Sequence, residues 1–200
     1  MKLNTILAAV CIIMAISLCV VPYYWIDGLA IIFIALPLLL LELGLMVWLG
    51  IRLYKPNKKM RKVFQKFSFY ANIVLAVASL FIEVPIEFLD WHLRKPVRNE
   101  IVLKVKNGVL KPNAQYNKGI CSLGNSYFPP LSNGGNEIIV EYGKVNSVTV
   151  EFFINRGFLD NYSAFVYTDD NEKIKELEDR IKSEIPGNRI LGNNWYRVSY

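Results

Sequence analysis

Hydrophobic residues are concentrated in three long runs within the first 91 positions of the chain. Each run is about 24 residues long, and a helix of that length rises roughly 36 Å, whereas the hydrocarbon core of a bilayer is about 30 Å thick. A single segment satisfies its backbone hydrogen bonds in such a core only as a helix. The pattern therefore predicts three transmembrane helices, at about 4–25, 29–51 and 68–91.

The first run has an alternative interpretation as a cleaved signal peptide, because Lys2 precedes its apolar stretch. However, the run is long for the apolar core of such a peptide, and no small-residue cleavage site follows it. Instead it ends in the aromatic cluster Tyr23, Tyr24 and Trp25, which is typical of a membrane interface. We therefore expect an uncleaved anchor.

Positive charges are concentrated between the second and third runs. Residues 52–66 contain seven Lys or Arg and no acid, and they account for most of the net charge of +6. The positive-inside rule then predicts a cytoplasmic N-terminus and a cytoplasmic 52–66 loop in a bacterial inner membrane. Residues 97–200 are expected in the periplasm or outside the cell. A short tether of this kind suits contact with the lipid bilayer, and we expect no nucleic-acid binding.

Of the four carboxylates within the apolar runs, three form a candidate site, and the fourth, Asp90, lies next to the end of the third run. Glu42 lies near the middle of the second run, and Glu83 and Glu87 lie in the third, four residues apart and therefore on one helical face. Ionisable residues within membrane segments are candidates for function, so one interpretation is an intramembrane polar site for a proton or a cation. The alternative is that one protonated or hydrogen-bonded Glu joins the helices while another lies at the membrane interface.

The remaining half of the chain, residues 97–200, is predicted to form an α+β domain with a mainly antiparallel sheet and one packed helix. Pro96 is expected to end the third helix, and Asn107-Gly108 predicts a hairpin turn within residues 101–110. An apolar stripe that follows Asp169 and ends before Pro186 predicts the helix, with capping-box spacing between Asp169 and Glu172. Alternating runs predict further strands at 138–142, 147–154, 162–168 and 195–200.

A long segment rich in Asn, Gly, Ser and Pro occupies residues 111–136. Long ordered loops often carry function. A segment of this composition is equally consistent with a mobile insert, and the sequence leaves both interpretations open.

Catalytic and metal-binding patterns are not found in the sequence. The single histidine, His92, lies at the predicted membrane edge, and no nucleophile elbow or phosphate-binding glycine loop is present. The three cysteines, Cys11, Cys19 and Cys121, are too scattered for a structural zinc site. We therefore expect no cofactor, no metal and no enzymatic activity.

The C-terminal half is rich in aromatic residues, and rings that face outward suit partner binding. The candidates for such a surface are Tyr127, Phe128, Phe153, Trp195 and Tyr196. These features favour a non-enzymatic integral membrane protein whose outer domain binds a protein partner, in an immunity-type or envelope-assembly role. The alternative is an accessory subunit of a transporter or channel that uses the intramembrane carboxylates, and an enzyme acting on lipid or cell wall comes third.

Overall fold

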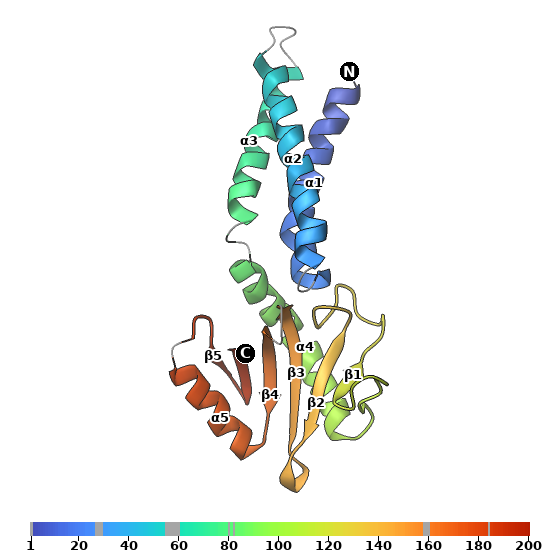
Figure 1. Cartoon of the computed structure of the whole chain (residues 1–200), viewed down its shortest axis with the longest axis vertical. Helices are drawn as coiled ribbons and strands as arrows, with labels where there is room; N and C mark the ends of the chain where they lie inside the picture. The colour runs from blue at the N-terminus through green and yellow to red at the C-terminus, as the bar shows by residue number, and fades with distance from the viewer. Residues whose placement is uncertain are drawn as a thin grey trace. The chain divides into compact units, whose positions relative to one another are not determined.

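The computed structural model consists of two compact units (Figure 1). A helical unit contains Met1–Tyr23 and Ala30–Phe88, and an α+β unit contains Tyr24–Leu29 and Leu89–Tyr200. The residues that the structure describes are 2–26, 30–54, 61–79, 81, 83–157, 161–183 and 185–200.

The helical unit is built from α1 (Lys2–Trp25), α2 (Ala30–Tyr54), α3 (Arg61–Ser79) and the first residues of α4 (Glu83–Lys106). The buried side chains of Cys11 and Leu49 form a small core, against which Leu45, Trp48 and Phe69 pack. A Cβ atom placed on Gly50 of α2 would lie 3.4 Å from the Phe69 ring of α3, so these two helices approach closely at that point.

The predicted transmembrane helices at 4–25, 29–51 and 68–91 are contradicted by the structure. Over its described residues, no helix has the length and apolar character that crossing a membrane requires. The third run is not one helix, because α3 ends at Ser79 and a separate helix begins at Glu83. Pro85 lies in the first turn of that helix, where proline is tolerated, and does not kink a longer one.

The conclusions that depended on three spanning helices are wrong for the same reason. These are the integral membrane fold, the inner-membrane location with an outer C-terminal domain, and both functional interpretations that assumed a membrane protein. The central part of the basic loop, residues 55–60, lies outside the described residues.

A six-stranded antiparallel sheet forms the centre of the α+β unit, in the order β1-β2-β3-β4-β6-β5. Three predicted strands in its middle and the predicted final strand are present, whereas the short strands at both edges were not predicted. The strands are β1 (Ile120–Ser122), β2 (Glu137–Tyr142), β3 (Val148–Arg156), β4 (Tyr162–Thr168), β5 (Arg189–Gly192) and β6 (Trp195–Ser199).

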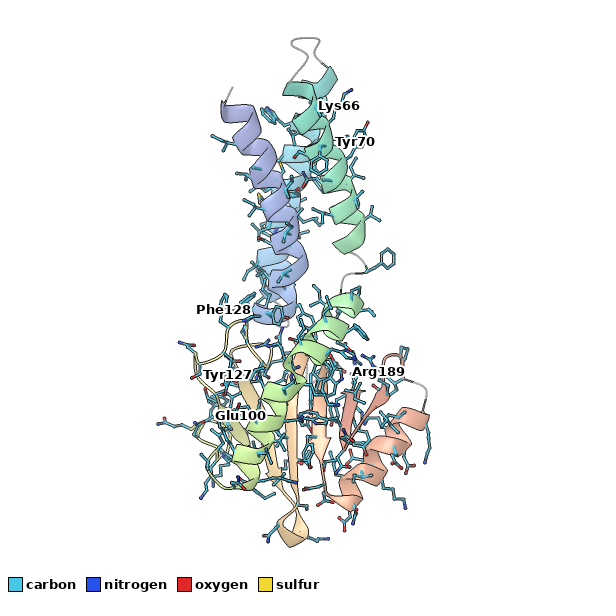
Figure 2. All side chains as sticks on the ribbon, turned by 180° about the vertical axis from the view of Figure 1, so that it is seen from behind. Lys66, Tyr70, Glu100, Tyr127, Phe128 and Arg189 are labelled. Carbon is cyan, nitrogen blue, oxygen red and sulfur yellow. The ribbon has the colours of Figure 1, made fainter. Side chains whose placement is uncertain are left out.

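Helices cover both faces of the sheet. On one face, the Trp91 ring of α4 lies 4.9 Å from that of Phe165 and 5.2 Å from that of Trp195, centroid to centroid. On the other face, α5 (Asn171–Lys182) buries Leu177 against Ala164 and Val166 of β4. Since neighbouring residues of a strand point to opposite faces, the unit has three layers. Figure 2 shows α4 crossing its face of the sheet.

The predicted hairpin at residues 101–110 is wrong, because α4 continues through Pro96 to Lys106. Ile101, Val102 and Val105 are buried, and their spacing puts them on one helical face. Their burial against the sheet outweighs the β preference of these residue types. The Asn107-Gly108 pair ends the helix: Gly108 has a φ of +68° and the Val109 amide donates to the Lys104 carbonyl at 2.9 Å. Two helices thus pack on the sheet where one was predicted.

Candidate functional site

The part of the α+β unit that best fits a binding site is the segment 123–131, which we call the aromatic loop. It carries Tyr127 and Phe128 and lies within the long segment whose order the sequence left open. Every residue of 111–136 is described, and the segment contains β1. Figure 2 shows the labelled Tyr127 and Phe128 side chains on this loop beside α4.

The Asn136 side chain holds the aromatic loop together by hydrogen bonds to its backbone. Its side chain is buried, its Oδ1 accepts a hydrogen bond from the Leu131 amide at 2.6 Å, and its Nδ2 donates to the carbonyls of Gly124 (3.0 Å) and Tyr127 (3.1 Å). Asn136 has a φ of 61°, a left-handed conformation that Asn adopts more readily than most residues. One amide group therefore links the two ends of the loop and its middle.

Two arginines of α4 hold the other side of the loop. The Arg94 guanidinium donates to the carbonyls of Pro129 and Pro130, the latter at 2.6 Å. The Arg98 guanidinium donates to the Leu131 carbonyl at 3.1 Å. Three successive carbonyl groups of the loop are thus fixed to the helix by charged donors, which make stronger hydrogen bonds than neutral ones.

Asp90 is the acceptor that orients both arginines. Its Oδ1 lies 3.2 Å from Arg94 Nη1, and its Oδ2 accepts from Arg98 Nη2. Its Oδ1 also accepts from the Tyr24 hydroxyl at 3.1 Å. Burial, and then the Asp90 charge, raise the pKa of Tyr24 to about 12, so the phenol remains a donor at neutral pH. The end of α1 and the aromatic loop are thus joined through one buried carboxylate.

The aromatic loop presents its rings outward. The Phe128 side chain is 85% exposed, and its ring lies 5.4 Å from that of Trp25, which is also exposed. Leu131, the last residue of the loop, is buried. Directly after it, the Ser132 hydroxyl accepts from the Phe153 amide at 2.9 Å, and the Asn133 amide donates to the Phe153 carbonyl at 2.8 Å. The exposed ring is therefore carried by a backbone that is tied to α4 and to β3.

The other aromatic candidates lie in the core. Trp195 is buried against Trp91, and its Nε1 donates to the Asn99 side chain at 2.9 Å. Tyr196 is buried on the opposite face beneath α5, and Phe153 is buried with its ring beside that of Tyr162. Of the five predicted rings, Tyr127 is half-buried and Phe128 alone is exposed.

The three carboxylates proposed as a polar site are in different surroundings. Glu42 is buried in the middle of α2, Glu87 is buried in the second turn of α4, and Glu83 is exposed at the start of that helix. Over the described residues, no three potential metal-ligating side chains form a group.

A hollow of about 390 Å³ at the start of α5 is lined by Lys144, Ser147, Asp169, Asp170, Asn171 and Glu172. Five of these six residues have polar partners within the fold. Asp170 caps α5 by accepting from the amides of Glu172 and Lys173, and its Oδ2 accepts from the Ser147 hydroxyl at 2.8 Å. Asp169 lies 2.5 Å from Lys106 Nζ. These contacts explain the local fold, and none of the six lining residues has a buried side-chain polar atom without a partner.

No family model, curated protein or solved structure matches this chain.

Asp90, Arg94, Arg98 and Asn136 were not found from the sequence. The first three recur at four-residue intervals, so they share one face of a helix. That signal was hidden because Pro96 was expected to end the helix among them.

Proposed function

We propose that the α+β unit is a protein-binding module and that the aromatic loop, together with Trp25, is its contact surface. The observation that carries this proposal is the 85% exposure of Phe128 on a loop that Asn136, Arg94 and Arg98 hold in place. Binding residues are commonly displayed on loops that a rigid scaffold positions.

Two physical arguments support a protein partner. Aromatic side chains dominate the residues that contribute most to protein interfaces, and burying an exposed Phe ring contributes about 1.5–3 kcal/mol. A loop that is already ordered also loses little conformational entropy when a partner binds, so more of the contact energy appears as affinity. The hydrogen bonds from α4 supply this order before binding.

Photo-crosslinking from the loop tests the proposal. In the full chain, p-benzoylphenylalanine replaces Phe128 in one variant and Tyr142 in a second. Tyr142 is a matched control, because it is also an exposed aromatic residue. It lies at the C-terminal end of β2, whereas the aromatic loop precedes the N-terminal end of that strand. We expect a discrete, protease-sensitive product from position 128 and none of that size from position 142.

The anchoring of the loop is tested in the same assay. Adding Arg94→Gln removes the charged donor to Pro129 and Pro130. We expect the yield at position 128 to fall at least about threefold, since the loop is no longer ordered before binding. No protein product at position 128, a product that contains only lipid, or the same product at both positions would contradict the proposed function.

A further inference from the structure

The helical unit has an inverted distribution of polarity over its described residues. Glu42, Ser68 and Asn72 are buried, while apolar side chains next to them in the sequence are exposed. Glu42 itself is 2% exposed, whereas its neighbours Leu41 and Leu43 are 54% and 44% exposed. The one carboxylate in the middle of α2 therefore points inward.

The surroundings of the Glu42 carboxyl are apolar. Leu45 and Leu49 follow it at three and seven residues, on the same helical face, and both belong to the cluster that contains Cys11 and Phe69. Neither carboxyl oxygen of Glu42 has a hydrogen-bond partner among the described residues. Among the residues that the structure describes, no Lys, Arg or His forms an ion pair with this carboxyl group.

A buried charge without a partner is so unfavourable that the group takes up a proton instead. Burial accordingly raises the pKa of Glu42. Burial, and then the proximity of Glu42, raise the pKa of the Cys11 thiol to about 11. This part of the core thus contains a carboxyl group that burial shifts toward its protonated form, beside a thiol that is not ionised at neutral pH.

We propose that Glu42 is a modification site for apolar carboxyl-directed electrophiles, specifically dialkylcarbodiimides such as N,N′-dicyclohexylcarbodiimide. These reagents are apolar, so they partition into surroundings that exclude water, and they react there with a protonated carboxyl group. The acid transfers its proton to one carbodiimide nitrogen, and its oxygen forms a bond to the central carbon. The acyl group then migrates from that oxygen to the other nitrogen and gives a stable N-acylurea. This is an addition, so no group leaves and no further reactant is needed.

The selectivity of this site follows from the same geometry. An apolar reagent partitions among the exposed leucines that flank Glu42 and reaches the acid when the helices fluctuate. A cationic, water-soluble carbodiimide is excluded from the same surroundings because it would have to lose its hydration. Glu83 belongs to the same unit but is exposed, so the cationic reagent can reach it from water.

The test labels the folded full chain at pH 7 with the dicyclohexyl reagent or with a cationic water-soluble carbodiimide and an amine. Mass spectrometry of the digested chain then locates the label. We expect Glu42 to be modified by the apolar reagent, and Glu83 to be modified at least tenfold faster than Glu42 by the cationic one. Labelling of Glu42 should also decrease as the pH is raised, since the reaction consumes the protonated form.

Two controls accompany this test. The unfolded chain, labelled at acidic pH, shows that the Glu42 peptide is recovered and can react. The variant Glu42→Gln should lose the label, which confirms that the label is on Glu42. The proposal is overturned if Glu42 in the folded chain stays unlabelled by the apolar reagent. It is equally overturned if the cationic reagent labels Glu42 as fast as Glu83, because the carboxyl would then be in contact with water.

Discussion

Asp90 and Arg98 lie two helical turns apart on α4 and form an ion pair in which both residues are almost fully buried, at 3% and 2% exposure. The Arg98 guanidinium also lies 4.7 Å from the centroid of the Phe165 ring and donates to the Leu131 carbonyl. The pair therefore links α4, the sheet and the end of the aromatic loop.

Breaking this pair from one side is expected to destabilise the α+β unit strongly. Asp90→Asn leaves the Arg98 guanidinium buried without a carboxylate partner, which costs about 3–5 kcal/mol. Arg98→Met should cost less, because Asp90 still has Arg94 at 3.2 Å. The double variant should lose less than the sum of the two changes, because neither charge remains. Urea unfolding followed by tryptophan fluorescence measures these free energies.

A surface pair provides the control for that series. Lys182 and Asp179 lie 3.0 Å apart with side chains 72% and 59% exposed, so Lys182→Ala should change the stability little. If the double variant of Asp90 and Arg98 lost as much stability as the two single variants together, the two side chains would not stabilise the unit as a pair.

Asn136 is expected to control the order of the aromatic loop. Asn136→Gly retains the left-handed backbone but removes the side-chain bonds to Leu131, Gly124 and Tyr127. Amide hydrogen exchange at Leu131 should therefore become at least about tenfold faster, since a net hydrogen bond contributes roughly 1 kcal/mol and three are lost.

The matched control for this change is Asn146→Gly. Asn146 also has a positive φ, of 60°, but lies in the short 3-10 helix Lys144–Asn146 between β2 and β3. This variant should leave exchange at Leu131 unchanged. Equal protection in wild type and Asn136→Gly would mean that the arginines of α4 alone hold the loop.

The strands were predictable where turn residues bound them and where apolar and polar positions alternate along them. β4 was predicted at its observed bounds, and β2, β3 and β6 were predicted to within two residues at each end. β5 was missed because it has four residues and three of them are exposed, so it shows no alternation. β1 has only three residues inside a segment of loop composition.

The helices were harder to predict because their limits depend on packing. Ile101, Val102 and Val105 are typical strand residues, and only the sheet they pack on favours the helix. The exposed Phe128 was among the predicted binding residues, but so was the buried Trp195. Composition identifies aromatic residues without giving the face on which each lies, and the loop's anchors required the three-dimensional arrangement.

Phe128 and Phe165 should respond in opposite ways to truncation. Phe165 is fully buried between Trp91 and Arg98, so Phe165→Ala is expected to cost about 3–5 kcal/mol of stability. Phe128→Ala should change stability by less than about 0.5 kcal/mol, because its ring is exposed.

Partner binding should depend on Phe128, although stability does not. Once the crosslinked partner is identified, Phe128→Ala should weaken its affinity about tenfold or more, which corresponds to about 1.4 kcal/mol. A large loss of stability in Phe128→Ala would instead indicate that the ring packs within the chain.

Glu151 gives the α+β unit a pH dependence whose sign follows from its surroundings. The residue is buried in the sheet, and its carboxyl accepts hydrogen bonds from the hydroxyls of Tyr162 at 2.9 Å and Tyr200 at 3.1 Å. Burial raises its pKa, and the nearby Glu141 adds to this, whereas the two phenols and Lys173 lower it; the net direction is upward from 4.5.

A carboxyl whose pKa is higher in the folded state binds its proton more tightly there. Its contribution to stability is therefore fully present below about pH 4.5 and is lost as the pH rises through the folded pKa. Glu151→Gln is never charged and keeps one carbonyl acceptor for a phenol. The stability of wild type relative to this variant should thus fall with rising pH above about 4.5 and then become constant.

Urea unfolding of both proteins at a series of pH values between about 4 and 8 measures this difference. Glu100→Gln serves as the control, since that side chain is 61% exposed and pairs with Lys104 at the surface. Its difference from wild type should vary little with pH. If the stability of wild type relative to Glu151→Gln increased with pH, the fold would favour the carboxylate, and the two tyrosine hydroxyls would then outweigh the effect of burial.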